Sequence, residues 1–300
     1  MMANQKPSSQ IVVACPSPCI AGAQLWVDEI KKSGSGDSSP TSSIQVVAFD
    51  PYGDRTACRR ASDELIKALG HGVIHALVMN WQGCIPGRFG VVLEESGMLE
   101  MAQIKLLSQM YLIEAMIEKQ MLVDASRVII SGSEAARGLL PMFSVPQLGD
   151  TLDAYISVLN GTELDREEGH NIYSHIQGIL SLYIASLARK HPSILFWLLS
   201  PGLTQDSLNK HIQIEENPPT FKFEDLVEYG IAQDYKIAAT NFFRAMVGSA
   251  EWDYPSGVLV AAAKGTSGNL CDQATLEDGK YLSDHKNQDL AFEAIHSFAT

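Results

Sequence analysis

The sequence lacks the features that mark a membrane-spanning or nucleic-acid-binding protein. No apolar run approaches the roughly 20 residues that a bilayer-spanning helix requires, and the longest, Ile194–Leu199, has the length of a buried strand. Its 22 basic residues stand against 35 acidic ones, a net charge of -13, whereas a partner with a phosphate backbone requires a basic face. We therefore expect no transmembrane segment and no nucleic-acid partner.

Cysteine is also scarce. The chain has five cysteines, an odd number, which suits a reducing compartment; they are Cys15, Cys19, Cys58, Cys84 and Cys271. Cys15 and Cys19 could form half of a metal site, but no Cys-x-x-Cys or His pair supplies the other half, so we expect free thiols and no metal. The first residues lack the apolar core of a secretory signal. We expect a cytoplasmic or organelle-soluble protein, and a cleaved transit peptide would leave no trace in this sequence.

Short apolar runs alternate with amphipathic stretches along the chain, which is typical of β-α units in a parallel sheet. Six runs are apolar almost throughout and show no alternation, as in strands covered by helices on both faces: Ile11–Ala14, Ile44–Phe49, Ala76–Met79, Val128–Ser131, Ile194–Ser200 and Val258–Ala263. The pattern predicts an α/β fold, a three-layer doubly wound (Rossmann-like) and mostly parallel sheet of about six strands, in a single domain over residues 1–300.

Five amphipathic stretches between these runs have helical spacing: 20–32, 58–69, 98–122, 173–190 and 225–247. The polar tract 33–43 is predicted to be a flexible loop. Two long irregular stretches, 141–170 and 203–224, follow the carboxyl ends of strands, where open α/β sheets bind ligands. We expect each loop to form either the wall of a pocket or a surface that binds a partner.

Four spaced segments resemble the short-chain dehydrogenase/reductase family, and together they cover nearly the whole chain. Arg127–Gly138 is similar to the family's serine strand and the turn after it, and Tyr173-Ser-His-Ile-Gln177 stands where the family has Tyr-x-x-x-Lys. Ser200-Pro201-Gly202-Leu-Thr204 resembles the Pro-Gly turn beside the nicotinamide. Leu77-Val-Met-Asn80-Trp-Gln-Gly83 is similar to the Asn-Asn-Ala-Gly strand end.

The family's nucleotide loop, Thr-Gly-x-x-x-Gly-Ile-Gly, is replaced here by Ala14-Cys15-Pro16-Ser17-Pro18-Cys19-Ile20-Ala21. Glycines let the backbone turn tightly and approach the pyrophosphate at the helix N-terminus. Cys15 and Cys19 put side chains where the diphosphate would lie, and the two prolines remove backbone donors. With Ser17 and Ile20 at the remaining family positions, we expect no standard cradle and hence no cofactor.

The chain also departs from the family in the number of residues between its first two characteristic turns. The turn at Asp50 resembles the family's adenine-side Asp turn, but only about 35 residues separate it from Cys15, too few for the strand-helix unit that normally lies between. In the alternative, Ile44–Phe49 is itself the missing strand, which usually ends with the residue that chooses between NAD and NADP, and Asp50 contacts the ribose. Asp50 is also an ordinary turn former.

The resemblance implies a catalytic set in which Tyr is the general acid/base, Lys lowers the Tyr pKa and holds the nicotinamide ribose, Ser orients the carbonyl and Asn completes a proton relay. Ser133 and Tyr173 remain in the implied places, whereas Gln177 takes the Lys position and Lys105 the Asn position. Gln cannot supply the charge that makes a phenol with a pKa near 10 useful around neutrality. Lys105 could substitute from the opposite helix, or Ser133 and Tyr173 could be a turn residue and a partly buried helix-start tyrosine.

These departures predict a diverged, catalytically impaired relative of the family that serves as a binding or assembly scaffold, for a partner protein or a small hydrophobic ligand, without a cofactor. The alternative is an NAD(P)H-dependent oxidoreductase, using NADP or NAD, that acts on a carbonyl or conjugated double bond of a hydrophobic small molecule. In the family, the helix at 98–122 and the helix at 173–190 pair across a two-fold axis, so the resemblance also implies a homodimer.

Overall fold

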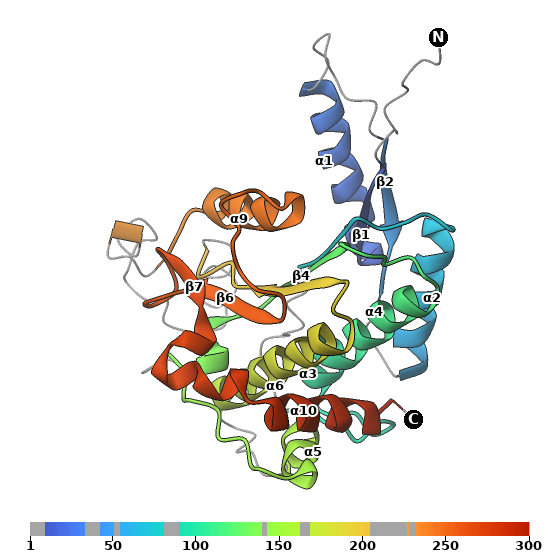
Figure 1. Cartoon of the computed structure of the whole chain (residues 1–300). Helices are drawn as coiled ribbons and strands as arrows, with labels where there is room; N and C mark the ends of the chain where they lie inside the picture. Colours follow the sequence, from blue (N-terminus) through green and yellow to red (C-terminus); the bar gives the residue numbers. More distant parts are fainter. Residues whose placement is uncertain are drawn as a thin grey trace, which may run out of the picture.

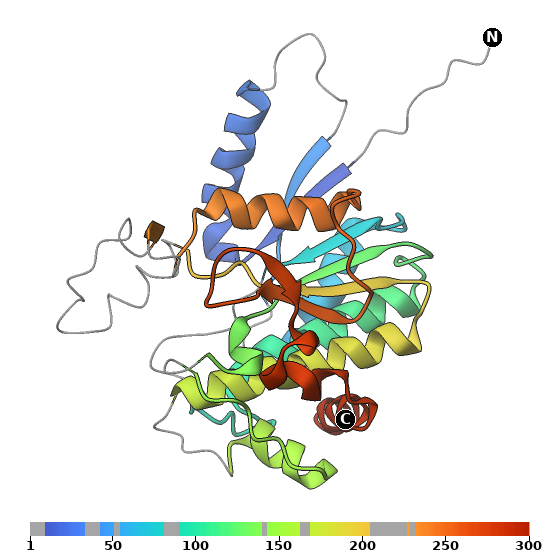
Figure 2. The same ribbon diagram turned by 60° about the vertical axis from the view of Figure 1, so that its left-hand side comes forward.

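The computed structural model describes residues 10–33, 43–50, 55–80, 90–139, 143–162, 169–204, 227–228 and 232–299. The strands lie between two layers of helices (Figure 1). One layer contains α1 (Ile20–Ser33) and α9 (Tyr235–Val247), and the other contains α4 (Ser108–Glu118) and α6 (Gly169–Lys190) (Figure 2). The predicted three-layer, doubly wound α/β fold is confirmed.

The strands form two ladders instead of one continuous sheet. β1 (Gln10–Cys15) pairs in parallel with β2 (Ser43–Ala48). The larger sheet has the order β3-β4-β5-β6-β7, with the bounds Ala76–Met79, Arg127–Ser131, Leu195–Leu199, Val258–Ala262 and Leu270–Asp272. All its pairs are parallel except β6 with β7. The six predicted strands are therefore confirmed within one or two residues, and the short β7 is an addition that the sequence did not indicate.

The partner of β1 distinguishes the two interpretations of segment 44–49. In doubly wound sheets of the order 3-2-1-4, the second strand lies beside the first. β2 pairs with β1 along its whole length, from Gln10 with Ser43 to Cys15 with Ala48. This pairing favours the alternative in which this segment is the strand next to β1, and Asp50 follows directly from it.

Most predicted helices are present, with shifted ends. α2 spans Arg55–Leu69, and the predicted helix at 98–122 consists of α3 (Glu100–Ala102), a π-helical turn η2 (Gln103–Leu107) and α4. Two helices lie where none was predicted: α5 (Leu152–Asn160), within the stretch predicted to be irregular, and α10 (His285–Ser297). Short 3-10 turns connect these elements: η1 (Ser17–Cys19), η3 (Glu134–Arg137), η4 (Gln273–Thr275) and η5 (Glu277–Ser283).

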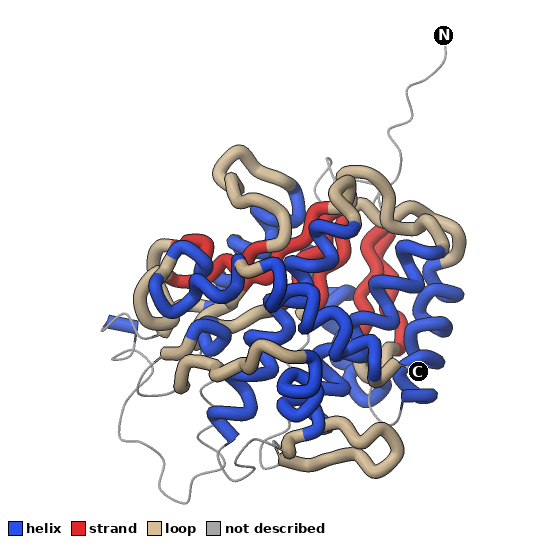
Figure 3. The backbone as a smooth tube through the Cα atoms, turned by 60° about the horizontal axis from the view of Figure 1, so that its bottom comes forward, coloured by secondary structure: helices blue, strands red, loops and turns tan. Residues whose placement is uncertain are grey.

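The main core lies under the helices of the second layer, which cover the strands when the molecule is viewed from below (Figure 3). A smaller core packs α9 on the opposite face around Trp197, whose indole N–H donates to the Tyr254 and Pro255 carbonyls. The outer side of α6 is covered by α10 of the same chain. The two helices expected to pair with a second copy are therefore already covered in part within the chain.

None of the helices in the described ranges is long and apolar enough to cross a membrane. In the same ranges, no three His, Cys, Asp or Glu side chains gather as ligands for a metal ion.

Candidate functional site

The turn after β1 is built from prolines and a protein carboxylate. Cys15 ends β1, and the Cys19 N–H donates to the Pro16 carbonyl at 2.7 Å before α1 begins at Ile20. The Asp50 carboxylate accepts from the Ser17 N–H at 2.8 Å and also from the Ser17 hydroxyl. The Ser17 N–H, in the 3-10 turn that precedes α1, therefore already has an anion as its partner, close to the helix N-terminus where a phosphate is favoured in related folds.

The two thiols of this turn differ in exposure. Cys15 is partly buried and Cys19 is exposed. Burial raises the pKa of the Cys15 thiol, and the nearby Cys19 and Asp50 raise it further. Cys15 therefore stays a neutral thiol at neutral pH and offers no charge to a ligand.

The 3-10 turn η3, which follows β4, packs against α6. The Ser133 hydroxyl accepts from the Ala135 N–H at 3.2 Å and caps η3. Tyr281 of η5 lies between these two elements. Its hydroxyl donates to the Ala136 carbonyl of η3 and lies 2.5 Å from the place that a Cβ on Gly178 of α6 would occupy. The Tyr173 ring, near the start of α6, has its centroid 5.6 Å from that of the Phe143 ring.

The residue at the position of the family's lysine, Gln177, is fully buried. Gln177 is 0% exposed, and neither atom of its side-chain amide has a hydrogen-bond partner in the described part of the chain. Lys105 is 1% exposed, and its Nζ donates to the Ser131 carbonyl at 3.2 Å. Lys105 therefore reaches the end of β4 from the opposite helix, as its place in the sequence allowed, but its ammonium is enclosed by protein.

Hydrogen bonds from two directions fix the Pro201–Gly202 turn. The Gly202 N–H donates to the Ser200 hydroxyl at 3.0 Å, and the Gln233 side-chain amide donates to the Pro201 carbonyl at 2.5 Å. Gly202 has φ +67°, and a Cβ there would collide with the Thr266 carbonyl oxygen. Only glycine suits this position, because it combines a left-handed backbone with a close approach.

A buried carboxylate at this turn was missed in the sequence. Glu134, directly after Ser133, is 3% exposed and accepts from the Ser200 hydroxyl at 2.6 Å and from the Ala262 N–H at 3.4 Å. Burial raises the pKa of Glu134, and these hydrogen bonds oppose the rise only in part. Glu134 therefore joins the ends of β4, β5 and β6 behind the Pro-Gly turn. The signal for it was an acidic residue three positions after an apolar strand, in the turn that follows it.

The remaining predicted residues are placed as follows. Asn80 follows β3 and is exposed. Gly83, Cys84 and most of loops 33–43 and 203–224 lie outside the described residues, and so do parts of 141–170.

No family model and no curated protein sequence matches the chain. Solved structures do match. A "MalC Reductase/Diels-Alderase" from Malbranchea aurantiaca is 14% identical with a TM-score of 0.56, covering 86% of each chain. A 7 alpha-hydroxysteroid dehydrogenase complexed with NADH and 7-oxo glycochenodeoxycholic acid is 16% identical with a TM-score of 0.55, covering 87% of this chain and 86% of its own. A short chain dehydrogenase from Burkholderia cenocepacia in complex with NADP is 17% identical with a TM-score of 0.52, covering 86% and 87%.

The fold is therefore first of the doubly wound, Rossmann-like class and, within that class, the fold of the short-chain dehydrogenases/reductases. The resemblance inferred from the four sequence segments is confirmed at the level of the fold. The expectation that no cofactor is bound is contradicted, because structures that share this fold hold NADP in one case and NADH in another. That expectation depended only on the residues that stand in place of the family's glycines in the turn after β1.

Proposed function

We propose that the protein binds a nicotinamide dinucleotide at the carboxyl ends of its strands and is impaired as a tyrosine-dependent oxidoreductase, so that binding or assembly is its main role. The observation that carries the proposal is Gln177, which is uncharged and sealed at the position of the family's lysine. The likeness to structures complexed with NADH and NADP supports the dinucleotide.

The turn after β1 would hold the adenosine half loosely and would discriminate between the two nucleotides. Asp50 lies at the end of the strand beside β1, where an acidic residue hydrogen-bonds the ribose hydroxyls of NAD. The same carboxylate would repel the additional 2′-phosphate of NADP. Because Ser17 is already engaged by Asp50, a bound nucleotide must compete for this N–H, and we expect NADH to bind more tightly than NADPH.

In the other half of the crevice, Gln177 stands at the position of the family's lysine, on the same helix as Tyr173. A phenol with its ordinary pKa near 10 is a poor proton carrier around neutrality unless a positive charge stabilises its anion. Gln177 carries no charge, and hydride transfer coupled to Tyr173 is therefore expected to be slow. A small hydrophobic ligand or a partner protein would then be bound without being turned over.

One observation favours the second candidate, an NAD(P)H-dependent oxidoreductase that acts on a carbonyl or conjugated double bond of a hydrophobic molecule. Lys105 extends from the opposite helix to Ser131, two residues before Ser133. If the crevice opens when a nucleotide binds, this ammonium would take the role of the family's lysine beside Tyr173.

Two measurements separate the candidates. NADH and NADPH are titrated against the purified chain, and a nucleotide at 100 times its dissociation constant should stabilise it by about 2.7 kcal/mol. Asp50→Ala should reduce the preference for NADH. No shift with either nucleotide would reject the proposal.

Turnover is then followed as NADH oxidation with a panel of hydrophobic ketones and enones. Impairment predicts equal, low rates for the wild type, Tyr173→Phe and Lys105→Met, and a higher rate for Gln177→Lys, which restores the lysine. A wild-type rate that both Tyr173→Phe and Lys105→Met abolish would establish the oxidoreductase instead.

A further inference from the structure

A small cavity lies between α6, the start of β6 and the start of α10. Its volume is about 220 Å³, which corresponds to about seven water molecules at about 30 Å³ each. The turn before β6 and the first residues of this strand line the cavity, whereas the proposed nucleotide crevice lies at the carboxyl ends of the parallel strands. The cavity is therefore separate from that crevice and too small for a dinucleotide.

Small side chains on the facing elements leave this space. Ser181 and Ala185 lie one turn apart on α6, and both line the cavity together with Arg189, one turn further on. On the opposite side, a Cβ at Gly257 would come within 2.9 Å of the Ala188 Cβ, so the turn before β6 packs directly against α6. Apolar side chains form much of the remaining wall: Val258, Leu259, Ala274 and Leu282.

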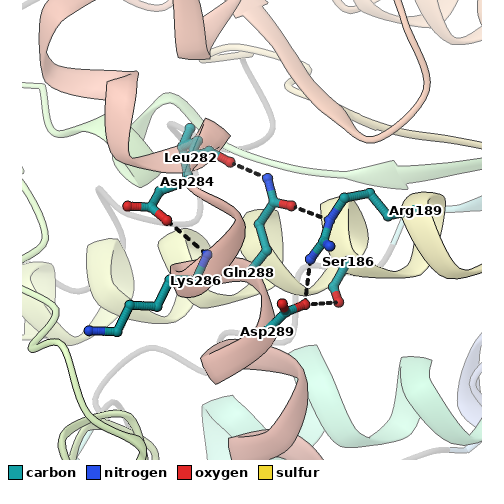
Figure 4. A network of polar contacts seen from close by, with 7 residues as sticks. All are labelled: Ser186, Arg189, Leu282, Asp284, Lys286, Gln288 and Asp289. Carbon is teal, nitrogen blue, oxygen red and sulfur yellow. Dashed lines mark hydrogen bonds and ion pairs between the residues drawn. The ribbon is translucent and has the colours of Figure 1, made fainter.

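A polar network fixes the part of the wall that α10 forms (Figure 4). Arg189 of α6 donates from Nε to the Gln288 side-chain oxygen at 2.7 Å and forms an ion pair with Asp289. The Gln288 amide donates to the Leu282 carbonyl at 2.9 Å. This wall is therefore held in place by the protein itself.

Asp272, at the end of β7, brings a carboxylate to the cavity. Its Oδ1 accepts from the Ala274 N–H at 2.9 Å and caps η4, whereas its Oδ2 has no hydrogen-bond or ion-pair partner among the residues that the structure describes. Burial raises the pKa of Asp272, and the bond from the Ala274 N–H opposes this rise only in part. A partly buried carboxylate is stabilised by a cation beside it, so a cationic ligand suits this wall.

The other charged groups near the cavity do not supply that cation. The Arg189 guanidinium is paired with Asp289. Lys286 extends away from Arg189 (Figure 4) and pairs with Asp150 at 3.7 Å. Among the described residues that line the cavity, His285 is the only further titratable side chain, and it is exposed.

Two hydroxyl groups on the wall add hydrogen-bond acceptors. The Ser181 hydroxyl donates to the Gln177 carbonyl at 2.8 Å, so its oxygen remains able to accept. The Ser256 oxygen accepts from the Phe196 N–H at 2.9 Å and has a second lone pair. An ammonium group donates three hydrogen bonds and accepts none, and it therefore matches a carboxylate and hydroxyl oxygens.

We propose that this cavity binds a small organic amine in its protonated form, with the ammonium group on Asp272 and a short hydrocarbon body against Ala185, Leu259 and Leu282. Alkyl ammonium groups are charged at neutral pH, as the lysine side chain is. The volume of the cavity limits the hydrocarbon body to a short chain or a single ring.

The experiment titrates butylamine and benzylamine against the purified full chain, with binding followed by saturation-transfer NMR. Asp272→Asn keeps the size of the side chain and its cap but removes the charge, and it should weaken the binding of both amines at least about tenfold. The matched control is Asp234→Asn, because Asp234 caps α9 by accepting from the Lys236 N–H at 2.8 Å, outside the cavity. This control should bind both amines as the wild type does.

Two further comparisons locate the ligand and test its charge. Ala185→Leu fills the cavity and should abolish binding, with the melting temperature showing that the variant is folded; if it is not, the pair of aspartate variants still decides. Butanol and benzyl alcohol, which lack the charge, should bind at least about tenfold more weakly than the amines. The proposal is wrong if the wild type binds neither amine at millimolar concentrations, or if the alcohols, Asp272→Asn or a folded Ala185→Leu match the wild type with the amines.

Discussion

Replacing Ile295 by alanine tests whether α10 is part of the core or only lies on its surface. Ile295 is 0% exposed and belongs to the main core cluster, on the side of α6 that faces away from the sheet. The substitution removes three carbon atoms, which at about 0.8 kcal/mol each gives about 2.4 kcal/mol of lost burial. The cavity left behind adds to this loss, and buried Ile→Ala changes cost about 2–5 kcal/mol in all. We expect the unfolding free energy to fall by about 3–4 kcal/mol.

The matched control is Ile237→Ala on α9, where the isoleucine is 52% exposed. Both substitutions gain the same small helix propensity, so the difference between them measures burial. Exposed sites change stability by no more than about 0.5 kcal/mol. The assay is urea unfolding followed by circular dichroism and by tryptophan fluorescence. A difference between the two variants below about 1 kcal/mol would refute the assignment of α10 to the core.

Three further predictions concern the strand ends and α10. Gly202→Ala should lower the melting temperature more than Gly268→Ala does, because both glycines have a positive φ but only the first Cβ would meet backbone, the Thr266 carbonyl; equal shifts would contradict the described turn. Burial raises the pKa of Glu134, so the wild type should lose more stability than Glu134→Gln does as pH rises above 4.5, and parallel pH profiles of unfolding would argue against a buried carboxylate. Burial lowers the pKa of His296, but hydrogen bonds to a carboxylate and a carbonyl outweigh this and raise it. The stability that this histidine contributes should therefore be present below pH 6.5 and lost as pH rises through its folded pKa, and His296→Gln should remove that pH dependence.

The sequence predicted the strands well because each is a mainly apolar run. The expected cover on both faces holds for β4, β5 and β6, which are buried at four of five positions, whereas β1 has no buried residue. Helix α10 could not be found in the same way. Its buried positions are largely alanines and a glutamine, with Ile295 the only large aliphatic side chain among them, so its hydrophobic stripe is weak. The Asp284 cap, which accepts from the Lys286 N–H at 2.8 Å, was the available signal. Helix α5 was missed because it lies in a stretch with a Pro-rich start and many polar residues.

At the site, chain order was enough to bring the ends of β1, β3, β4 and β5 to one edge of the sheets, because parallel strands end together. It was not enough to find contacts between distant segments. The bond between Asp50 and Ser17 and the bonds around Glu134 join residues 33 and 66 positions apart. Neither follows from local spacing. The sequence analysis inferred from the absent glycines of one turn that no cofactor binds. This inference was wrong because a nucleotide also contacts other strand ends, which the turn does not represent.

The separation of β1 and β2 from the larger ladder has an evolutionary consequence. In the proposed function, the adenosine half of the nucleotide would lie on the small two-stranded ladder, whereas Ser133 and the Pro-Gly turn follow strands of the five-stranded sheet and Tyr173 lies on α6. Changes at Cys15 or Pro16 would then disturb few of the contacts that hold the larger unit together. Selection on nucleotide affinity could therefore relax, or be re-established, while the remainder of the molecule kept its shape.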